Sequence, residues 1–407
     1  MKTATVTWVS YNNYGTMLQA YALQQFLLSN GIDNTIVSDK EIIKEQHGRI
    51  NSKNIHAKEQ LSFTSPRKTK IERFVQRIKK YCLSPQKLIR AYKEKRADLK
   101  DAKRNKIYKD TQEKFDVFKN TKLVISKPYN TSQLSDLSKQ FDLFLCGSDQ
   151  IWSVFKQNFN GFFYLNFTDK KKVSYAASIG TENISTEQME TIKKWLNDFS
   201  AISVRESQTA RQLSENISKE VEWVVDPTLL FDKNFWSHFA KDGLKIKKGY
   251  IICYFLRNNE QYFRYAEKLA QCLKLKILLI PGHYDLYKKR ECVNSAIGPC
   301  DFVSLIQNAK FVLTDSYHAT LFSLIFNKRF VCLKRFKPTD EFCQNIRVVS
   351  LLKKINLENR FVDSDVFLKE HTAAINYKEI NEIISNFTQK SKEFLLNNLK
   401  EHCNDYQ

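Results

Sequence analysis

Short apolar runs alternate with segments of helical periodicity along most of this chain, and this alternation constrains its fold more than any other feature. Tyr250–Phe255 and Phe311–Thr314 have the length and β-branched, aromatic content of buried strands, whereas Glu260–Leu273 repeats apolar residues at helical spacing. Strands that alternate with helices form parallel sheets, because each helix returns the chain across one face of the sheet. The sequence therefore predicts an α/β fold.

Two such series are expected, because 407 residues exceed what one hydrophobic core usually serves. The breaker Asp226-Pro227-Thr228 separates them. We predict a Rossmann-like domain over residues 1–228, a second over 229–376 and a C-terminal helix over 377–407. Strands in the first domain are expected at Thr3–Val9, Asp33–Val37, Asp142–Cys146, Lys172–Ala176, Ala201–Val204 and Val221–Val225.

Ligands of open α/β sheets bind beyond the carboxyl ends of the strands. That rule selects four loops, which are Ser10–Gly15, Gly147–Trp152, Arg205–Glu206 and Asp315–His318. If two doubly wound domains face each other, these loops meet at one cleft.

The first two loops carry side chains that suit a sugar. Amides bind hydroxyl groups and a carboxylate accepts from them, so we expect the acceptor to be bound by Asn12, Asn13, Tyr14, Gly15 and Asp149. The alternatives are structural: an Asx turn that caps the following helix, and a cap provided by Ser148 or Asp149.

The other two loops suit an anion and a proton transfer. Arg205 follows a strand directly, and a guanidinium offers paired donors to phosphate or carboxylate, although a structural pair with Glu206 or another acid is the alternative. Ser316 and Tyr317 lie where a helix begins and are expected to contact the same anion. His318 lies in the first turn of that helix, whose positive end favours a neutral ring that can act as a general base.

Charge is unevenly distributed. The chain carries 65 Lys and Arg against 44 Asp and Glu, and residues 44–110 contain 21 basic and 7 acidic side chains. This segment, predicted as a basic helical insertion at about 44–120, favours an anionic partner such as a membrane surface, or is a solvated helical face. Nucleic acid is not the expected partner, because no recognition motif for it is present.

Neither a signal peptide nor a metal site is expected. Nine scattered cysteines without a C-x-x-C pair fit neither a disulfide framework nor zinc ligation. The N-terminus lacks the apolar core of a signal peptide, so the predicted location is the cytoplasm, with peripheral contact at the inner face of the membrane.

Six segments together resemble the polysaccharide pyruvyl transferase family across roughly residues 5–335. They read NNYGTMLQAYAL, FDLFLCGSDQIW, SYAASIG, ISVRE, VVDPTLL and FVSLIQNAKFVLTDSYHATLFSLIFNKRF. The resemblance implies a GT-B-like fold, with two Rossmann-like domains around a cleft closed by a C-terminal helix. It also implies transfer of a pyruvyl group from phosphoenolpyruvate to sugar hydroxyls of a surface-polysaccharide precursor, which forms a ketal without an obligatory cofactor.

The family's donor-binding arginine corresponds to Arg205 and its histidine to His318. Many members carry a second arginine at the position of Ser316. The absence of this arginine is expected to weaken donor binding by about 1.5–3 kcal/mol unless another group replaces it. Two alternatives stay open: a glycosyltransferase in which Asp340 or Glu341 binds the ribose of a nucleotide sugar, and a non-enzymatic anion- or nucleic-acid-binding protein.

Overall fold

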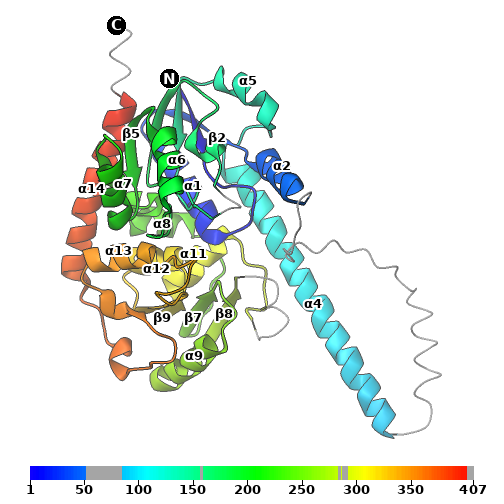
Figure 1. Cartoon of the computed structure of the whole chain (residues 1–407). Helices are drawn as coiled ribbons and strands as arrows, with labels where there is room; N and C mark the ends of the chain where they lie inside the picture. Colours follow the sequence, from blue (N-terminus) through cyan, green and yellow to red (C-terminus); the bar gives the residue numbers. More distant parts are fainter. Residues whose placement is uncertain (52–84, 156–158, 283–285, 287–291, 401–407) are drawn as a thin grey trace, which may run out of the picture.

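The computed structural model describes residues 1–51, 85–155, 159–282, 286 and 292–400 (Figure 1). Its strands form two sheets in which neighbouring strands run parallel. The first has the order β2-β1-β3-β4-β5-β6 and the second β11-β10-β9-β7-β8. The first sheet consists of β1 (Lys2–Val6), β2 (Asp33–Val37), β3 (Leu143–Cys146), β4 (Lys171–Ser174), β5 (Phe199–Val204) and β6 (Val221–Trp223). The second consists of β7 (Tyr250–Phe255), β8 (Lys276–Pro281), β9 (Phe311–Thr314), β10 (Phe330–Leu333) and β11 (Phe361–Val362).

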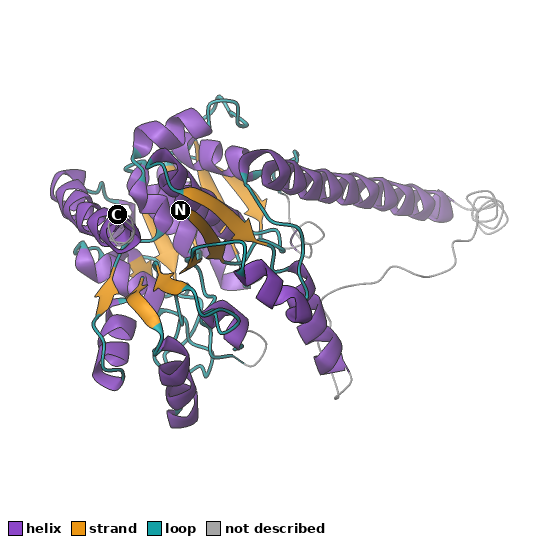
Figure 2. Cartoon of the chain, turned by 90° about the horizontal axis from the view of Figure 1, so that it is seen from above, coloured by secondary structure: helices purple, strands orange, loops and turns teal. Residues whose placement is uncertain are grey.

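Helices connect the strands and cover both sheets (Figure 2). Those of the first half are α1 (Tyr14–Ser29), α2 (Lys40–Asn51), α4 (Pro85–Lys122), α5 (Leu134–Ser138), α6 (Thr186–Leu196) and α7 (Ser207–Asn216). Those of the second half are α8 (Lys233–Phe239), α9 (Glu260–Leu273), α11 (Pro299–Asn308), α12 (Tyr317–Ile325), α13 (Ile346–Lys354) and α14 (Tyr377–Lys400).

The strand orders determine where a ligand can bind. In the first sheet the order reverses between β1 and β3, and in the second between β7 and β9. A reversal leaves a crevice beyond the carboxyl ends of the two central strands, because the helices that follow them lie on opposite faces. The loops after β1, β3 and β9 are therefore the ones that carry Asn12, Asp149 and His318.

Among three hydrophobic clusters of the described residues, one spans both sheets. Its buried members include Leu23 of α1, Leu145 of β3, Ile252 of β7 and Phe302 of α11. The helix α1 contributes to the contact between the halves, because its Tyr14 ring stacks on Phe302 with centroids 4.5 Å apart. The α/β fold with two facing parallel sheets is thus confirmed. The domain limits at residues 228 and 376 stay a prediction.

The C-terminal helix α14 lies along one side of the molecule (Figure 1). It returns to the first half, where the Phe387 ring contacts Trp223 and the Ser391 hydroxyl accepts a hydrogen bond of 3.0 Å from the amide of Val225. The expected C-terminal helix is confirmed, and it supports the segment that leads from β6 to Asp226.

The predicted basic insertion contains the 38-residue helix α4, which projects far beyond the body of the molecule (Figures 1 and 2). Its C-terminal part is anchored by Phe115, whose ring lies 4.9 Å from that of Tyr14, and by an ion pair of 2.7 Å between Lys114 and Asp301. In the sequence, Ile71, Phe74, Val75, Ile78 and Tyr81 have the spacing of one apolar helix face, and this predicted helix lies outside the described residues. Within the described part of the chain, no helix is both long and apolar enough to cross a membrane.

Strands β1, β4 and β6 end two or three residues earlier than the sequence predicts, at Val6, Ser174 and Trp223. The run Thr3–Val9 was expected to form a single strand, but β1 ends at Val6. Beyond that point the chain leaves the ladder because side chains take over its hydrogen bonds. The Thr7 hydroxyl donates to the carbonyl of Ser148 at 2.8 Å, and the amide of Val9 faces the carboxylate of Asp39 at 3.4 Å.

Candidate active site

The loop after β1 brings the first half of the chain against His318. Asn13 caps α1, since its side-chain oxygen accepts from the amide of Thr16 at 3.2 Å. A Cβ atom at Gly15 would lie 2.0 Å from Nδ1 of His318. No side chain fits between the two, so glycine is required for this approach of the histidine ring. The cap expected as an alternative is present, and the same loop forms a wall of the site.

Asn12 and Tyr14 of this loop already have partners. The amide nitrogen of Asn12 donates to Gln112 at 2.7 Å and its oxygen accepts from Lys119 at 3.0 Å, so α4 holds this side chain from outside. The hydroxyl of Tyr14 donates to the carbonyl of Ile297 at 3.0 Å. An amide group has two donors and two lone pairs, so Asn12 retains capacity for a sugar hydroxyl.

The loop after β3 holds Asp149 in a strained conformation. Its φ is +80°, a value that non-glycine residues adopt rarely and mostly where the surroundings enforce it. Its carboxylate accepts from Thr16 at 2.6 Å, from the amide of Gln150 at 2.9 Å and from Arg205 at 3.1 Å. These three hydrogen bonds offset the cost of the strained backbone. They also fix a carboxylate that connects the first two loops with the end of β5.

Arg205, directly after β5, is fully buried among three carboxylates. The ion pairs measure 3.1 Å to Asp149, 3.5 Å to Glu206 and 2.8 Å to Asp226. The guanidinium also lies over the ring of Tyr317, 4.8 Å from its centroid. Burial alone lowers the pKa of Arg205, but the neighbouring carboxylates outweigh it and raise the pKa above its ordinary value. The structural pair expected as an alternative is present, and the donor contact of Arg205 stays a prediction.

The carboxyl groups around Arg205 differ in their environment. Burial raises the pKa of Asp226, but His318 and Arg205 more than compensate and hold the pKa well below its usual range. Asp149 shows the same balance, and its pKa is also lowered. For Glu206 burial dominates and raises the pKa, even though its Oε1 accepts from Ser178 at 2.5 Å. Asp149 and Asp226 are thus stable anions in this interior.

His318 faces Asp226 across the two halves of the chain. Its Nε2 lies 3.4 Å from Oδ2 of Asp226, and the side chain is 8% exposed. This nitrogen is buried without a hydrogen-bond partner among the described residues. The other oxygen of Asp226 accepts from the amide and hydroxyl of Thr228, at 3.0 and 2.8 Å, which fixes the carboxylate. A fixed carboxylate beside an imidazole stabilises the imidazolium, so the His318 ring can take up a proton.

Ser316 and Tyr317 have structural roles in this arrangement. Ser316 is the N-cap of α12, and its hydroxyl accepts from the amide of Ala319 at 3.4 Å. Tyr317 is buried beneath the guanidinium of Arg205. Their contact with a donor stays a prediction.

Two residues of the site escaped the sequence analysis. Asp226 was considered only as part of a chain break, although it follows β6 at the same rim as the other candidates and could have been selected by the same rule. Arg347, in the first turn of α13, is 7% exposed and lies near Arg205, but the sequence offers no signal for its burial.

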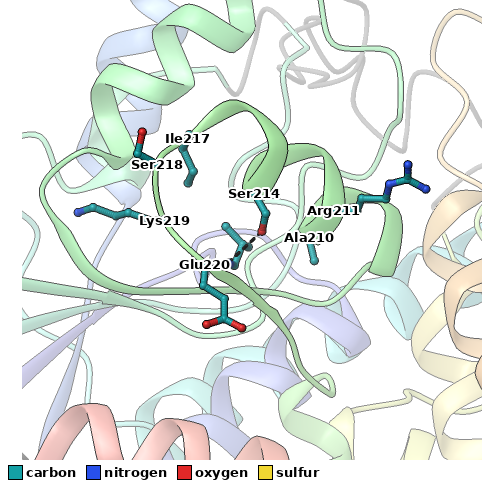
Figure 3. A pocket seen from close by; sticks show the side chains of 8 residues that line it. Ala210, Arg211, Ser214, Ile217, Ser218, Lys219 and Glu220 are labelled. Atoms are coloured by element: carbon teal, nitrogen blue, oxygen red, sulfur yellow. Dashed lines mark hydrogen bonds between the residues drawn. The ribbon is translucent and has the colours of Figure 1, made fainter.

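No cluster of three or more His, Cys, Asp or Glu side chains with the geometry of a metal site occurs among the described residues. Figure 3 shows a shallow hollow of about 600 Å³ at the edge of the first sheet. It is lined by α7, β6 and the turn between them, including Arg211, Lys219 and Glu220, and contains none of the candidate residues. The candidate site is instead a nearly closed cluster between the sheet rims.

The two parallel sheets, with a histidine and buried charges converging between their carboxyl rims, have the α/β architecture of the GT-B-like class. The sequence matches the family model described as polysaccharide pyruvyl transferase over residues 13–335, most of the chain. The chain belongs to the polysaccharide pyruvyl transferase family, and its substrate class includes a sugar acceptor. The non-enzymatic alternative is thereby set aside.

Several solved structures are similar to this chain at low identity. UDP-GlcNAc 2-epimerase from Methanocaldococcus jannaschii, in complex with UDP-GlcNAc and UDP, is 12% identical with a TM-score of 0.48, covering 98% of this chain and 100% of that one. The corresponding enzyme from Neisseria meningitidis, bound to UDP-GlcNAc, is 14% identical with a TM-score of 0.47 and the same coverage. Spinosyn rhamnosyltransferase SpnG, complexed with spinosyn aglycone, is 9% identical with a TM-score of 0.37, covering 97% and 96%. No curated protein sequence matches the chain significantly.

Proposed function

We propose that the enzyme transfers a pyruvyl group from phosphoenolpyruvate to two hydroxyls of a sugar in a surface-polysaccharide precursor. The observation that carries this proposal is the buried pair of His318 and Asp226, in which Nε2 lies 3.4 Å from Oδ2. Ketal formation from an enol ester requires a group that moves protons, and a histidine beside a fixed carboxylate suits that task.

The first step joins the sugar to the donor. One hydroxyl oxygen bonds to C2 of the enolpyruvyl group while C3 takes up a proton and becomes a methyl group. His318 accepts the hydroxyl proton, the carboxylate of Asp226 stabilises the imidazolium, and the imidazolium then gives the proton to C3. Asn12 and Asp149, on the loops after β1 and β3, are the proposed partners of the remaining sugar hydroxyls.

The second step closes the ketal. The bond between C2 and the phosphate oxygen breaks, phosphate leaves with the electron pair, and a neighbouring hydroxyl oxygen bonds to C2. The proton of that hydroxyl leaves with the phosphate. Each step moves a proton or a phosphate, so the scheme requires no cofactor beyond the donor, and activity that survives exhaustive EDTA treatment would support this.

Incubation with phosphoenolpyruvate and lipid-linked galactosides or N-acetylhexosamines tests the proposal, with mass spectrometry to detect the added pyruvyl group. We expect His318→Ala to reduce turnover about 10²–10⁴-fold, the usual contribution of a general acid or base. His238→Ala is the matched control, because His238 is exposed on α8, and it should retain activity. Full activity of folded His318→Ala would remove the histidine from the scheme.

A further inference from the structure

Arg347 is a buried arginine without a carboxylate partner. It lies in the first turn of α13 and donates only to Gln344, at 3.4 Å to the backbone carbonyl and 3.2 Å to Oε1. Within the described part of the chain, no Asp or Glu oxygen lies within ion-pair distance of it. Arg205, at the same depth, has three such partners. A buried guanidinium without an ion-pair partner costs folding free energy unless a ligand supplies the missing charge.

Arg335, just beyond β10, adds a second cation. Its Nε is buried and has no hydrogen-bond partner among the described residues. Arg335 is the strongest charge that acts on the carboxyl of Asp315, whose two oxygens already accept from the amides of Leu256 and Arg257 at 2.7 and 3.0 Å. Burial first, and then the positive charges of Arg335 and Arg205, lower the pKa of Arg347 to about 9. The two guanidinium groups therefore repel each other, and an anion bound between them would be stabilised by both.

Their position places them at the candidate site. The charge of Arg347 acts on the carboxyl of Glu206 and the hydroxyl of Tyr317. Its partner Gln344 accepts from Gln150 of the first half at 3.0 Å, next to Asp149. An anion bound by Arg347 would therefore lie beside the cluster that holds His318.

We propose that Arg347 and Arg335 form the subsite for the phosphate group of the donor, in place of the arginine that Ser316 replaces. This inference rests on the proposed function, because it assigns the oxyanion to that reaction's donor. Arg205 is less suited, since an incoming phosphate would have to displace one of its three carboxylates. Guanidinium groups bind phosphate through paired, charge-assisted hydrogen bonds.

Steady-state kinetics and thermal-shift measurements on the full chain test this subsite. Arg347→Gln should raise the KM for phosphoenolpyruvate about 10–100-fold, which corresponds to one lost hydrogen bond to a charged group, and leave the KM for the acceptor unchanged. Inorganic phosphate should raise the melting temperature of the wild type but not of Arg347→Gln. Arg360→Gln is the matched control, because Arg360 is equally buried and donates only to the carbonyls of His371 and Ala373. Its donor KM should remain that of the wild type.

Comparing phosphate, phosphoenolpyruvate and a nucleotide sugar separates the test of the Arg347 subsite from the test of phosphoenolpyruvate as the donor. Stabilisation by a nucleotide sugar alone, lost in Arg347→Gln, would support the oxyanion subsite and exclude phosphoenolpyruvate as donor. Equal binding of every anion by wild type and Arg347→Gln, or no anion binding by the wild type, would overturn the subsite. Should Arg347→Gln fail to fold, Arg335→Gln provides the same comparison.

Discussion

Replacing Arg205 by methionine probes the buried charge cluster directly. The substitution removes the cation that Asp149, Glu206 and Asp226 share, and these side chains are 6%, 0% and 0% exposed. Removing one partner of a buried pair typically costs about 3–5 kcal/mol, because the remaining charge stays in a medium that solvates it poorly. We expect a loss of this size in the free energy of unfolding at pH 7.5.

The pH dependence of that loss identifies its cause. In the wild type the pKa values of Asp149 and Asp226 are lowered, so the stability they contribute is present above their unfolded pKa of about 3.9 and is lost only as pH falls through the lower folded values. Without Arg205, the pKa of Asp149 loses its main lowering influence and burial raises it, whereas His318 still lowers the pKa of Asp226. Stability should then recover as pH falls, by about 1.4 kcal/mol per pH unit for each proton taken up on folding.

Urea unfolding followed by tryptophan fluorescence at pH 7.5, 6.5 and 5.5 measures this difference. Burial already raises the pKa of Glu206 in the wild type, so the informative quantity is the gap between variant and wild type at each pH. Arg211→Met is the control, because Arg211 is exposed and pairs only with Glu215 on α7, and it should leave the pH profile unchanged. A gap below about 1 kcal/mol, or one that is constant with pH, would show that Arg205 does not neutralise buried carboxylates.

Two further predictions concern the glycine beside the histidine and the basic helix. Gly15→Ala should displace His318 and lower turnover about 10²-fold with the fold retained. Gly31→Ala, at φ +75° with open space around it, should cost only about 1 kcal/mol of stability and keep the turnover, and equal kinetics for both variants would refute this steric argument. We also propose that the protein binds vesicles of phosphatidylglycerol but not of phosphatidylcholine, through α4 and the net charge of +21. Flotation should show binding at 50 mM salt and release at 500 mM, whereas salt-independent binding, or binding to duplex DNA alone, would contradict it.

Periodicity and turn chemistry predicted most of the fold. Tyr250–Phe255 and Phe311–Thr314 are strands with the predicted limits, because buried parallel strands consist almost wholly of apolar and β-branched residues bounded by polar ones. The rule that ligands bind beyond the carboxyl ends of the strands also selected loops that lie close together in the structure. Gly15 and His318, from opposite halves of the chain, are in contact. The local sequence was sufficient to predict these strands and loops, because their hydrophobic pattern and turn residues determine them.

The site could be predicted only in part, because packing between distant segments determines how its charges pair. Arg205 offers the same donors to a phosphate as to three carboxylates, and only the assembled fold shows that the carboxylates occupy them. Asp226 appears in the sequence as the residue before a proline. Arg347 appears as an ordinary helical arginine, and its burial depends on how α13 meets the other half, where Ser350 donates to Gln208 at 2.5 Å.

A crystal structure with phosphoenolpyruvate bound would examine the convergence of these groups most directly. The expected result is density for the donor with its phosphate within hydrogen-bond distance of Arg347 and its enol carbon next to Nε2 of His318. Density for phosphoenolpyruvate elsewhere, away from both His318 and Arg347, would contradict the proposed site.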